Sequence, residues 1–182
     1  MTIEAGPAEL YTTAARAADV PALVELVNAA YRGEKPPRGW TSEAGLVAGR
    51  RLEPAAAAAL VAGPDSAVLV VRAQSGLFGA VALRRRPAGV AEIEYLAVRP
   101  SLQGNGLGRA LLATAEAFAR AELGAATLEL AVLAPREELL AWLERRGFAP
   151  TGERRVLPAA EAFGEPRTEG LTLDVLARPL AG

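Results

Sequence analysis

The chain has 182 residues, of which 51% are hydrophobic, and a formal net charge of −1. This length suits one globular domain with a substantial core. The near-zero charge favours neither nucleic acid nor an anionic membrane surface as a partner. Cysteine and histidine are both absent. Their absence excludes disulfides, thiolate nucleophiles, histidine bases and the commonest transition-metal ligands, so we expect no metal site.

No stretch of the sequence has the pattern of a secretion signal or of a membrane span. The start, MTIEAGPAEL, lacks a basic segment followed by a long apolar run. The apolar runs, such as AAAAALVAG, are too short to cross a bilayer. We therefore expect a cytoplasmic protein that forms a single domain over residues 1–182, with 1–8 as a loose amino-terminal segment.

The first half of the chain shows helical periodicity between an initial strand and a hairpin. Asp19 is a plausible cap for the first helix, and Pro54 stands at the start of another. In chain order, the predicted elements are a strand over 9–14, helices over 20–31, 43–50 and 54–62, and strands over 67–73 and 77–84.

The second half of the chain alternates strands with helices. The predicted elements are a strand over 91–98, a helix over 107–123, a strand over 127–133, a helix over 135–146, extended structure from 148 onward and a final strand over 171–175. Residues 161–169 are predicted to be a loop rich in Gly, Pro and charge. This order predicts an α/β fold with one mixed sheet and helices on its faces.

A glycine-rich stretch, QGNGLG at residues 103–108, connects the strand over 91–98 to the helix over 107–123. Glycine permits positive φ, and successive backbone N–H groups at a helix start form an anion site suited to phosphate. The stretch lacks the Gly-Lys-Ser/Thr of a Walker loop and the G-x-G-x-x-G spacing of a dinucleotide fingerprint. Taken alone, it is also compatible with an ordinary glycine turn that caps a helix.

The same stretch matches Q/R-x-x-G-x-G/A, the coenzyme A pyrophosphate loop of the GNAT acetyltransferase superfamily. Its surroundings, AEIEYLAVRPSLQGNGLGRALLATAE, resemble the GNAT core motif, and LELAVLAPREELLAWLERRGFAPTGE resembles the strand and helix that follow it. The resemblance covers about residues 9–178. It implies a GNAT fold, with a mostly antiparallel sheet, one parallel pair of strands that splay apart, and helices on both faces.

The resemblance implies acetyl-CoA as co-substrate, with its pantetheine arm paired to exposed strand backbone in the gap between the splayed strands. The diphosphate is expected at the amides of the glycine-rich loop. The residues that the resemblance assigns to the coenzyme are Leu96, Ala97, Val98, Gln103, Gly104, Asn105, Gly106, Leu107, Gly108 and Arg109.

The resemblance also implies transfer of the acetyl group to an amine of a small molecule or peptide, by direct attack in a ternary complex. Glu92 matches the motif-strand glutamate that serves as base in several members. Glu94 shares its face in a regular strand, whereas Tyr95 should face away. Repulsion between two neighbouring carboxylates suits one of them as a base near neutral pH.

One position departs from the family pattern. The usual acid is a tyrosine four residues before the glycine of Gly-Phe, and Leu143 stands there. Tyr31 is the best substitute as acid. Two interpretations stay open, an enzyme that works without that tyrosine and a noncatalytic acetyl-CoA-binding sensor or interaction module.

In this family the first two helices and their loop cover the acceptor. Glu34 and Glu43 could attract a cationic amine, and Trp40 could stack on it. Arg50 and Arg51 could instead bind a carboxylate. Each of these residues could also belong to a solvated loop. A homodimer is expected only because homodimers are common in the family.

Overall fold

The computed structural model describes residues 10–33 and 42–180, so the expected loose segment at 1–8 lies outside the described residues. The helices and strands are β1 Tyr11–Ala14, α1 Val20–Arg32, β2 Val47–Ala48, α2 Pro54–Ala62, β3 Ser66–Ala73, β4 Gly76–Arg86, β5 Val90–Val98, α3 Leu107–Ala121, β6 Thr127–Leu133, α4 Glu137–Glu144, β7 Ala149–Val156, α5 Ala160–Phe163, β8 Glu165–Pro166 and β9 Thr172–Pro179. Short 3-10 turns cover Ala17–Asp19, Pro87–Gly89 and Pro100–Leu102.

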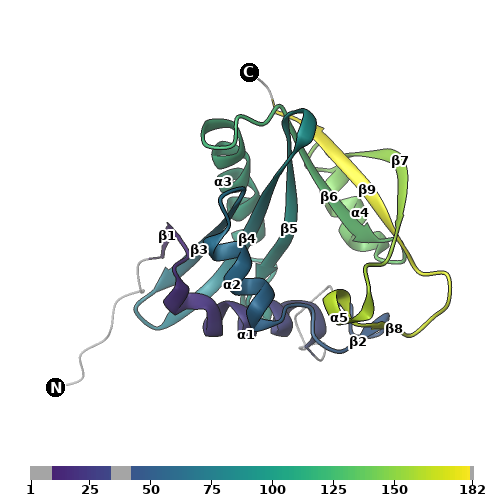
Figure 1. The fold of residues 1–182 in the computed structure, drawn as a ribbon, viewed down its shortest axis with the longest axis horizontal. Coiled ribbons are helices and arrows are strands. Elements are labelled where there is room, and N and C mark those ends of the chain that lie inside the picture. Colours follow the sequence, from purple (N-terminus) through teal and green to yellow (C-terminus); the bar gives the residue numbers. More distant parts are fainter. Residues whose placement is uncertain (1–9, 34–41, 181–182) are drawn as a thin grey trace.

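A seven-stranded sheet in the order β1-β3-β4-β5-β6-β9-β7 forms the centre of the fold. Its neighbouring strands are antiparallel, except that β5 and β6 are parallel. Helices α1 and α2 cover one face of the sheet, and α3 and α4 cover the other (Figure 1). The predicted α/β class, with one mixed sheet between helices, is therefore confirmed.

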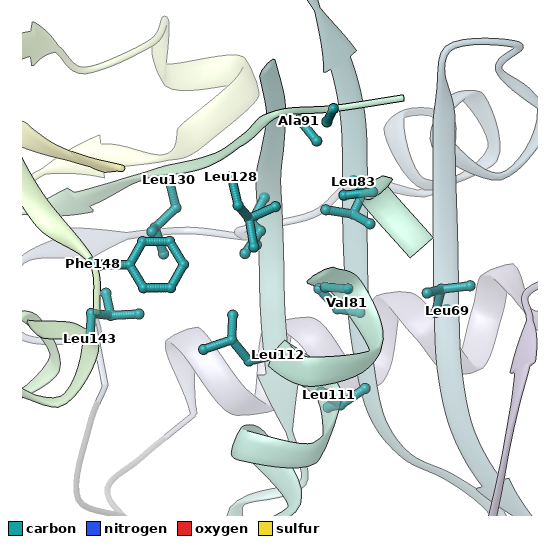
Figure 2. Packing of buried hydrophobic residues seen from close by; sticks show 14 of the residues in the cluster. Leu69, Val81, Leu83, Ala91, Leu111, Leu112, Leu128, Leu130, Leu143 and Phe148 are labelled. Carbon is teal, nitrogen blue, oxygen red and sulfur yellow. The ribbon is translucent and has the colours of Figure 1, made fainter. Parts of the chain in front are cut away.

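Two apolar cores hold these layers together. On the α3 side, Leu111 and Leu112 face sheet residues such as Val81, while Leu143 and Phe148 close the end near β6 (Figure 2). On the other side, the buried stripe of α1 packs on β4 and β5, and α2 packs on β3. Burying one such aliphatic side chain contributes about 1.5–3 kcal/mol, so this two-sided burial dominates the stability of the sheet.

The predicted helix over 43–50 is wrong. The Ala44 N–H donates to Ser42 Oγ at 3.1 Å, and the turn that follows leads into β2, which pairs with β8. A serine bond of this kind starts a helix, and one turn does form, since the Val47 N–H donates to the Glu43 carbonyl at 2.9 Å. The pairing of β2 with β8 then ends this turn. The predicted loop over 161–169 contains β8 and most of α5. The other predicted helices and strands are present, with ends shifted by a few residues.

A β-bulge interrupts β5 at Glu94. Tyr95 lies opposite Ala82 of β4 and Ile93 lies opposite Leu83, so Glu94 is the extra residue. Because one extra residue reverses the alternation of side chains, Ile93 belongs to the α3-side core and Tyr95 to the α1-side core. The prediction that Tyr95 faces away from the two glutamates is therefore wrong.

The parallel pairing of β5 with β6 ends at the same place. It runs from Val90 opposite Thr127 to Ile93 opposite Leu130 and stops there. Beyond this point β5 follows β4 and β6 follows β9, so the two strands diverge (Figure 1). The resulting gap opens next to the glycine-rich loop that follows β5.

Candidate active site

Three cavities meet where β5 and β6 separate. The loop-side cavity, of about 430 Å³, lies against the glycine-rich loop, and the inner cavity, of about 70 Å³, lies at the divergence of the strands. The α2-side cavity, of about 420 Å³, lies on the opposite side. The loop-side and inner cavities share Leu96 and Val98, and the inner and α2-side cavities share Arg51 and Glu94. The inner cavity therefore shares lining residues with each of the two larger cavities.

The glycine-rich loop presents unused hydrogen-bond donors to the loop-side cavity. Gly104 and Gly106 have φ of +86° and +83°, which a side chain would strain. Within the described part of the chain, no backbone N–H from residue 104 to 109 has a hydrogen-bond partner. These amides stand at the positive end of α3, an arrangement suited to an anion. Arg109 adds a cation to the lining.

The side chains of the other two loop residues do not line this cavity. Asn105 is exposed, and Leu107 packs against the α3-side core. Only their backbone amides are available to a ligand. This arrangement limits the predicted roles of Asn105 and Leu107 to main-chain hydrogen bonds.

Two residues of the loop-side cavity were missed by the sequence analysis. The guanidinium carbon of Arg146 lies 3.6 Å from the ring centre of Trp142, and Arg146 Nη1 donates to the Trp142 carbonyl at 2.7 Å. Both residues line this cavity together with the loop. Burial, followed by the charges of Arg145 and Arg109, lowers the pKa of Arg146. The only signal in the sequence was their spacing of four residues, which places them on one side of a helix.

The exposed edge of β5 is occupied by two side chains. The Leu96 N–H donates to Tyr31 Oη at 3.0 Å, and Gln103 Nε2 donates to the Val98 carbonyl at 3.3 Å. Gln103 Oε1 is buried and has no partner among the described residues. Successive strand residues point their backbone groups to opposite edges. Because Leu96 and Val98 make their bonds at the gap, the backbone groups of Ala97 between them face β4.

Tyr31 reaches the inner cavity from α1, on the side opposite Leu143. Leu143 is fully buried, lines the inner cavity and belongs to the α3-side core. Tyr31 is the one tyrosine among the described lining residues of that cavity. Tyr95 instead lines the α2-side cavity, and burial raises its pKa, so its phenol stays neutral.

The two predicted glutamates occupy different environments. Glu92 lies 2.5 Å from Arg86 Nη2 and 3.0 Å from Arg155 Nη1, and it lines only the α2-side cavity. Glu94 accepts a hydrogen bond from Arg84 through Oε1 and lines both the α2-side and the inner cavity.

Arg155 also binds Glu129 at 2.6 Å and Glu153 at 2.7 Å, and hydrogen bonds to these carboxylates raise its pKa. This ion-pair network joins β5, β6 and β7, and the sequence analysis did not anticipate it. Because Arg155 arrives from a strand far along the chain, no local pattern identifies it.

The model of the acetyltransferase (GNAT) family matches residues 22–148. The chain belongs to the GNAT family of acetyltransferases. The chain resembles the ribosomal-protein-S18-alanine N-acetyltransferase of Escherichia coli, with a TM-score of 0.67, 20% identity and 96% of each chain covered. It also resembles the PaiA N-acetyltransferase of Thermoplasma acidophilum in complex with coenzyme A, with a TM-score of 0.70, 17% identity, and 94% of this chain and 99% of that chain covered.

A third similar structure is a GNAT family acetyltransferase of Elizabethkingia anophelis with acetyl-CoA bound. Its TM-score is 0.56, its identity is 19%, and 64% of this chain and 77% of that chain are covered. The search of curated proteins found no match. These structural likenesses agree with the fold assignment, and the family match makes this chain an acetyltransferase.

The acceptor side of this GNAT acetyltransferase differs from the sequence prediction at Glu43. Arg136 Nη1 donates to Glu43 Oε1 at 2.9 Å, and Arg32 Nη2 lies 3.2 Å from Oε2, with all three side chains nearly inaccessible. The charge of Glu43 is thus engaged by two guanidinium groups, and a role in attracting a cationic amine is not supported. Glu34 and Trp40, the other predicted acceptor residues, lie outside the described residues.

No group of three or more potential ligands is arranged to hold a metal ion in residues 10–33 and 42–180. Over the same residues, no helix is long and apolar enough to span a membrane.

Proposed function

We propose that this GNAT acetyltransferase transfers the acetyl group of acetyl-CoA to an amine by direct attack in a ternary complex. The proposal depends above all on the separation of β5 from β6 beyond Ile93 and Leu130. This separation lets the loop-side and α2-side cavities meet at the inner cavity, so the thioester and the amine can approach each other. The proposal treats residues 1–182 as one domain, because the central sheet includes strands from Tyr11 to Pro179.

The loop-side cavity fits coenzyme A by charge and by hydrogen bonding. Unpartnered amides of residues 104–109 suit the diphosphate, and Arg109 and Arg146 add positive charge. The pantetheine arm contains amides. One can donate to the Val98 carbonyl, which has a second lone pair beside the bond from Gln103 Nε2, and a carbonyl of the arm can take the Leu96 N–H in place of the Tyr31 hydroxyl. Gln103 Oε1, buried without a partner among the described residues, can accept an amide hydrogen from the same arm. The coenzyme bound in two similar structures supports this assignment.

Glu94 is the carboxylate best placed to act as the base. An alkylamine is mostly protonated at neutral pH, since its pKa is about 10, and it must lose a proton before it attacks. Glu94 lines both the cavity where the amine enters and the cavity where it reacts. Its Oε1 is held by Arg84, while Oε2 has no hydrogen bond to a described residue. That oxygen can take the proton directly or through one water.

Tyr31 is proposed as the acid that protonates the departing thiolate. Its hydroxyl lies 3.0 Å from the Leu96 amide, at the edge that the thioester arm would follow. With Leu143 in place of the usual tyrosine, Tyr31 is the phenol that the described inner cavity offers. A thiol with a pKa of about 8.5 also leaves readily as thiolate. Protonation of the leaving group therefore accelerates this reaction less than it accelerates the cleavage of an amide.

Calorimetric titration with acetyl-CoA and a thiol-release assay with a panel of amines, peptides and amino acids test the proposal. We expect saturable binding of acetyl-CoA and amine-dependent release of coenzyme A. Equal affinity for acetyl-CoA and adenosine diphosphate would contradict the coenzyme assignment. Binding of acetyl-CoA without thiol release for any amine would favour the noncatalytic alternative.

A further inference from the structure

Arg51 stands at the boundary between the inner and α2-side cavities and lines both. Among the described residues, it has no carboxylate within ion-pair distance. Every other arginine that lines the α2-side cavity has such a partner, the pairs being Arg50 with Glu53, Arg84 with Glu94, and Arg86 with Glu92. The unmatched cation of this cavity therefore lies at its inner end, next to the point of reaction.

The surroundings of Arg51 make this unmatched charge unusual. Its guanidinium carbon lies 4.5 Å from the ring centre of Phe163, 4.7 Å from that of Tyr95 and 5.4 Å from that of Tyr31. Nε is buried without a partner among the described residues, and Nη2 makes one long bond, of 3.3 Å, to the Glu94 carbonyl. Aromatic faces attract a cation but do not neutralise its charge. The electrostatic attraction between Arg51 and an anion bound here would therefore be stronger than the attraction between the same charges in open water.

The neighbouring charges add to this positive surplus. Arg32 and Arg136 share the single buried carboxylate of Glu43. Burial lowers the pKa of Arg32, and the nearby charges of Arg51 and Arg136 lower it further, although Glu43 opposes them. Among the described residues, the guanidinium groups of Arg32, Arg51 and Arg136 thus stand against the carboxylates of Glu43 and Glu94 at the inner end, a balance that favours an acceptor carrying an anionic group.

We propose that the acceptor is a small molecule carrying a carboxylate close to its amine, as an amino acid does, and that Arg51 binds this carboxylate. This inference rests on the proposed function, because it concerns the second substrate of the same transfer. A guanidinium group binds a carboxylate through two parallel hydrogen bonds, which also fixes its orientation. From Arg51, an amine a few bonds away reaches the inner cavity and Glu94, which lines it.

Matched acceptor series test the inference. The rate of thiol release from acetyl-CoA is measured for amino acids, for their carboxamides and for the corresponding decarboxylated amines, and also for aminophosphonates. We expect kcat/KM for the amino acids to exceed that for the carboxamides by about 10- to 100-fold, the range for one charge-assisted interaction. Faster turnover of the aminophosphonates would assign the site to a phosphonate or phosphate and overturn the carboxylate inference.

Variants of Arg51 identify the residue responsible. Arg51→Gln should abolish the preference for the amino acids, and Arg51→Lys, which keeps the charge but not the planar fork, should retain part of it. Arg154→Gln, which removes an exposed arginine of β7 paired with Asp174, is the control and should retain the full preference. The acetyl-CoA affinity of each variant, measured by calorimetry, shows whether the protein is folded.

Two results would overturn the inference while leaving the proposed function intact. One is a wild-type enzyme that acetylates carboxamides or plain amines as well as amino acids, and the other is a preference that survives in Arg51→Gln. If acetyl-CoA binds but no amine of any series releases thiol, the proposed function fails. The thermal shift of the coenzyme-bound protein then decides the inference, because only amino acids, and not their amides, should stabilise it through Arg51.

Discussion

Tyr31 and Leu96, which lie far apart in the sequence, are joined by a hydrogen bond of 3.0 Å from the Leu96 N–H to the Tyr31 hydroxyl. This bond spans the space between α1 and the open edge of β5, where the two substrates are proposed to meet. The hydroxyl therefore lies beside the backbone that would hold the thioester arm, and this position makes the proposed acid testable.

Tyr31→Phe removes the hydroxyl and keeps the ring. We expect kcat to fall by about 10²-fold, within the usual range for a general acid, while the affinity for acetyl-CoA changes little. Steady-state thiol release and calorimetry measure the two quantities. Tyr11→Phe, on an exposed residue of β1, is the matched control. Unchanged kcat in Tyr31→Phe would remove Tyr31 from the mechanism.

Leu143→Tyr places a phenol where relatives of the family carry one. Leu143 lines the inner cavity and is fully buried, so the larger ring must use the space of that cavity. In a protein that already carries Tyr31→Phe, we expect this change to restore kcat by about tenfold. Thermal unfolding shows whether the ring fits. A folded double variant without any gain would contradict the account of the missing acid.

Glu94→Gln should slow the reaction more than Glu92→Gln does, because Glu94 lines the inner cavity and Glu92 does not. We expect about a 10²-fold loss in kcat/KM at pH 7. The loss should shrink towards pH 10, where the amine is already deprotonated without a base. A pH–rate profile of both variants measures this trend, with the exposed Glu122→Gln as control. A larger loss in Glu92→Gln would assign the base to Glu92.

Gly108→Val should weaken acetyl-CoA binding by about tenfold or more. A Cβ at Gly108 would lie 3.6 Å from Trp142 in ordinary contact, so the backbone tolerates it, but the valine methyls would extend into the loop-side cavity. Gly106 is a poorer test, because its φ of +83° makes any side chain strained. Calorimetry measures the affinity, and Ala113→Val on the exposed side of α3 is the control. Equal affinities would contradict the assignment of this cavity to the coenzyme.

The ion pair between Asp19 and Arg72 should make the stability of the protein decrease in acid. The hydrogen bond from Arg72, at 2.6 Å, lowers the pKa of Asp19 despite the opposing effect of burial. A lowered carboxyl pKa contributes stability above the unfolded pKa of about 3.9, and this contribution disappears as the pH falls through the folded pKa. Asp19→Asn should therefore cost about 1–2 kcal/mol at pH 7 and little at pH 2–3.

Urea unfolding at the two pH values measures this difference. Asp174→Asn removes the partner of Arg154, whose side chain is 72% exposed, and should cost less than about 1 kcal/mol at either pH. An equal cost of Asp19→Asn at both pH values would show that the carboxylate charge is not the cause.

Local patterns in the sequence were sufficient for most of the fold. Three features depend only on residues within about one helical turn or hairpin of each other. They are the apolar face of α1, the turn between β3 and β4, and the glycine-rich loop before α3. The residues of the loop therefore indicated a candidate phosphate site, while an ordinary glycine turn stayed open until the family resemblance of the surrounding sequence was considered. The predicted helix over 43–50 failed because the pairing of β2 with β8 ends it after one turn, and β8 lies far along the sequence.

The sequence by itself determined the α/β class and most of the helices and strands in chain order. It also supplied the glycine-rich loop as a candidate anion site, the candidate glutamates and the absence of the usual tyrosine. Only the tertiary structure decided which glutamate reaches the inner cavity, that Ala97 faces β4, that Arg146 stacks on Trp142, and that Arg51 has no carboxylate partner among the described residues. The reason is physical, because a β-bulge shifts every side chain beyond it, and the charge balance of a cavity depends on residues brought together from distant strands and helices.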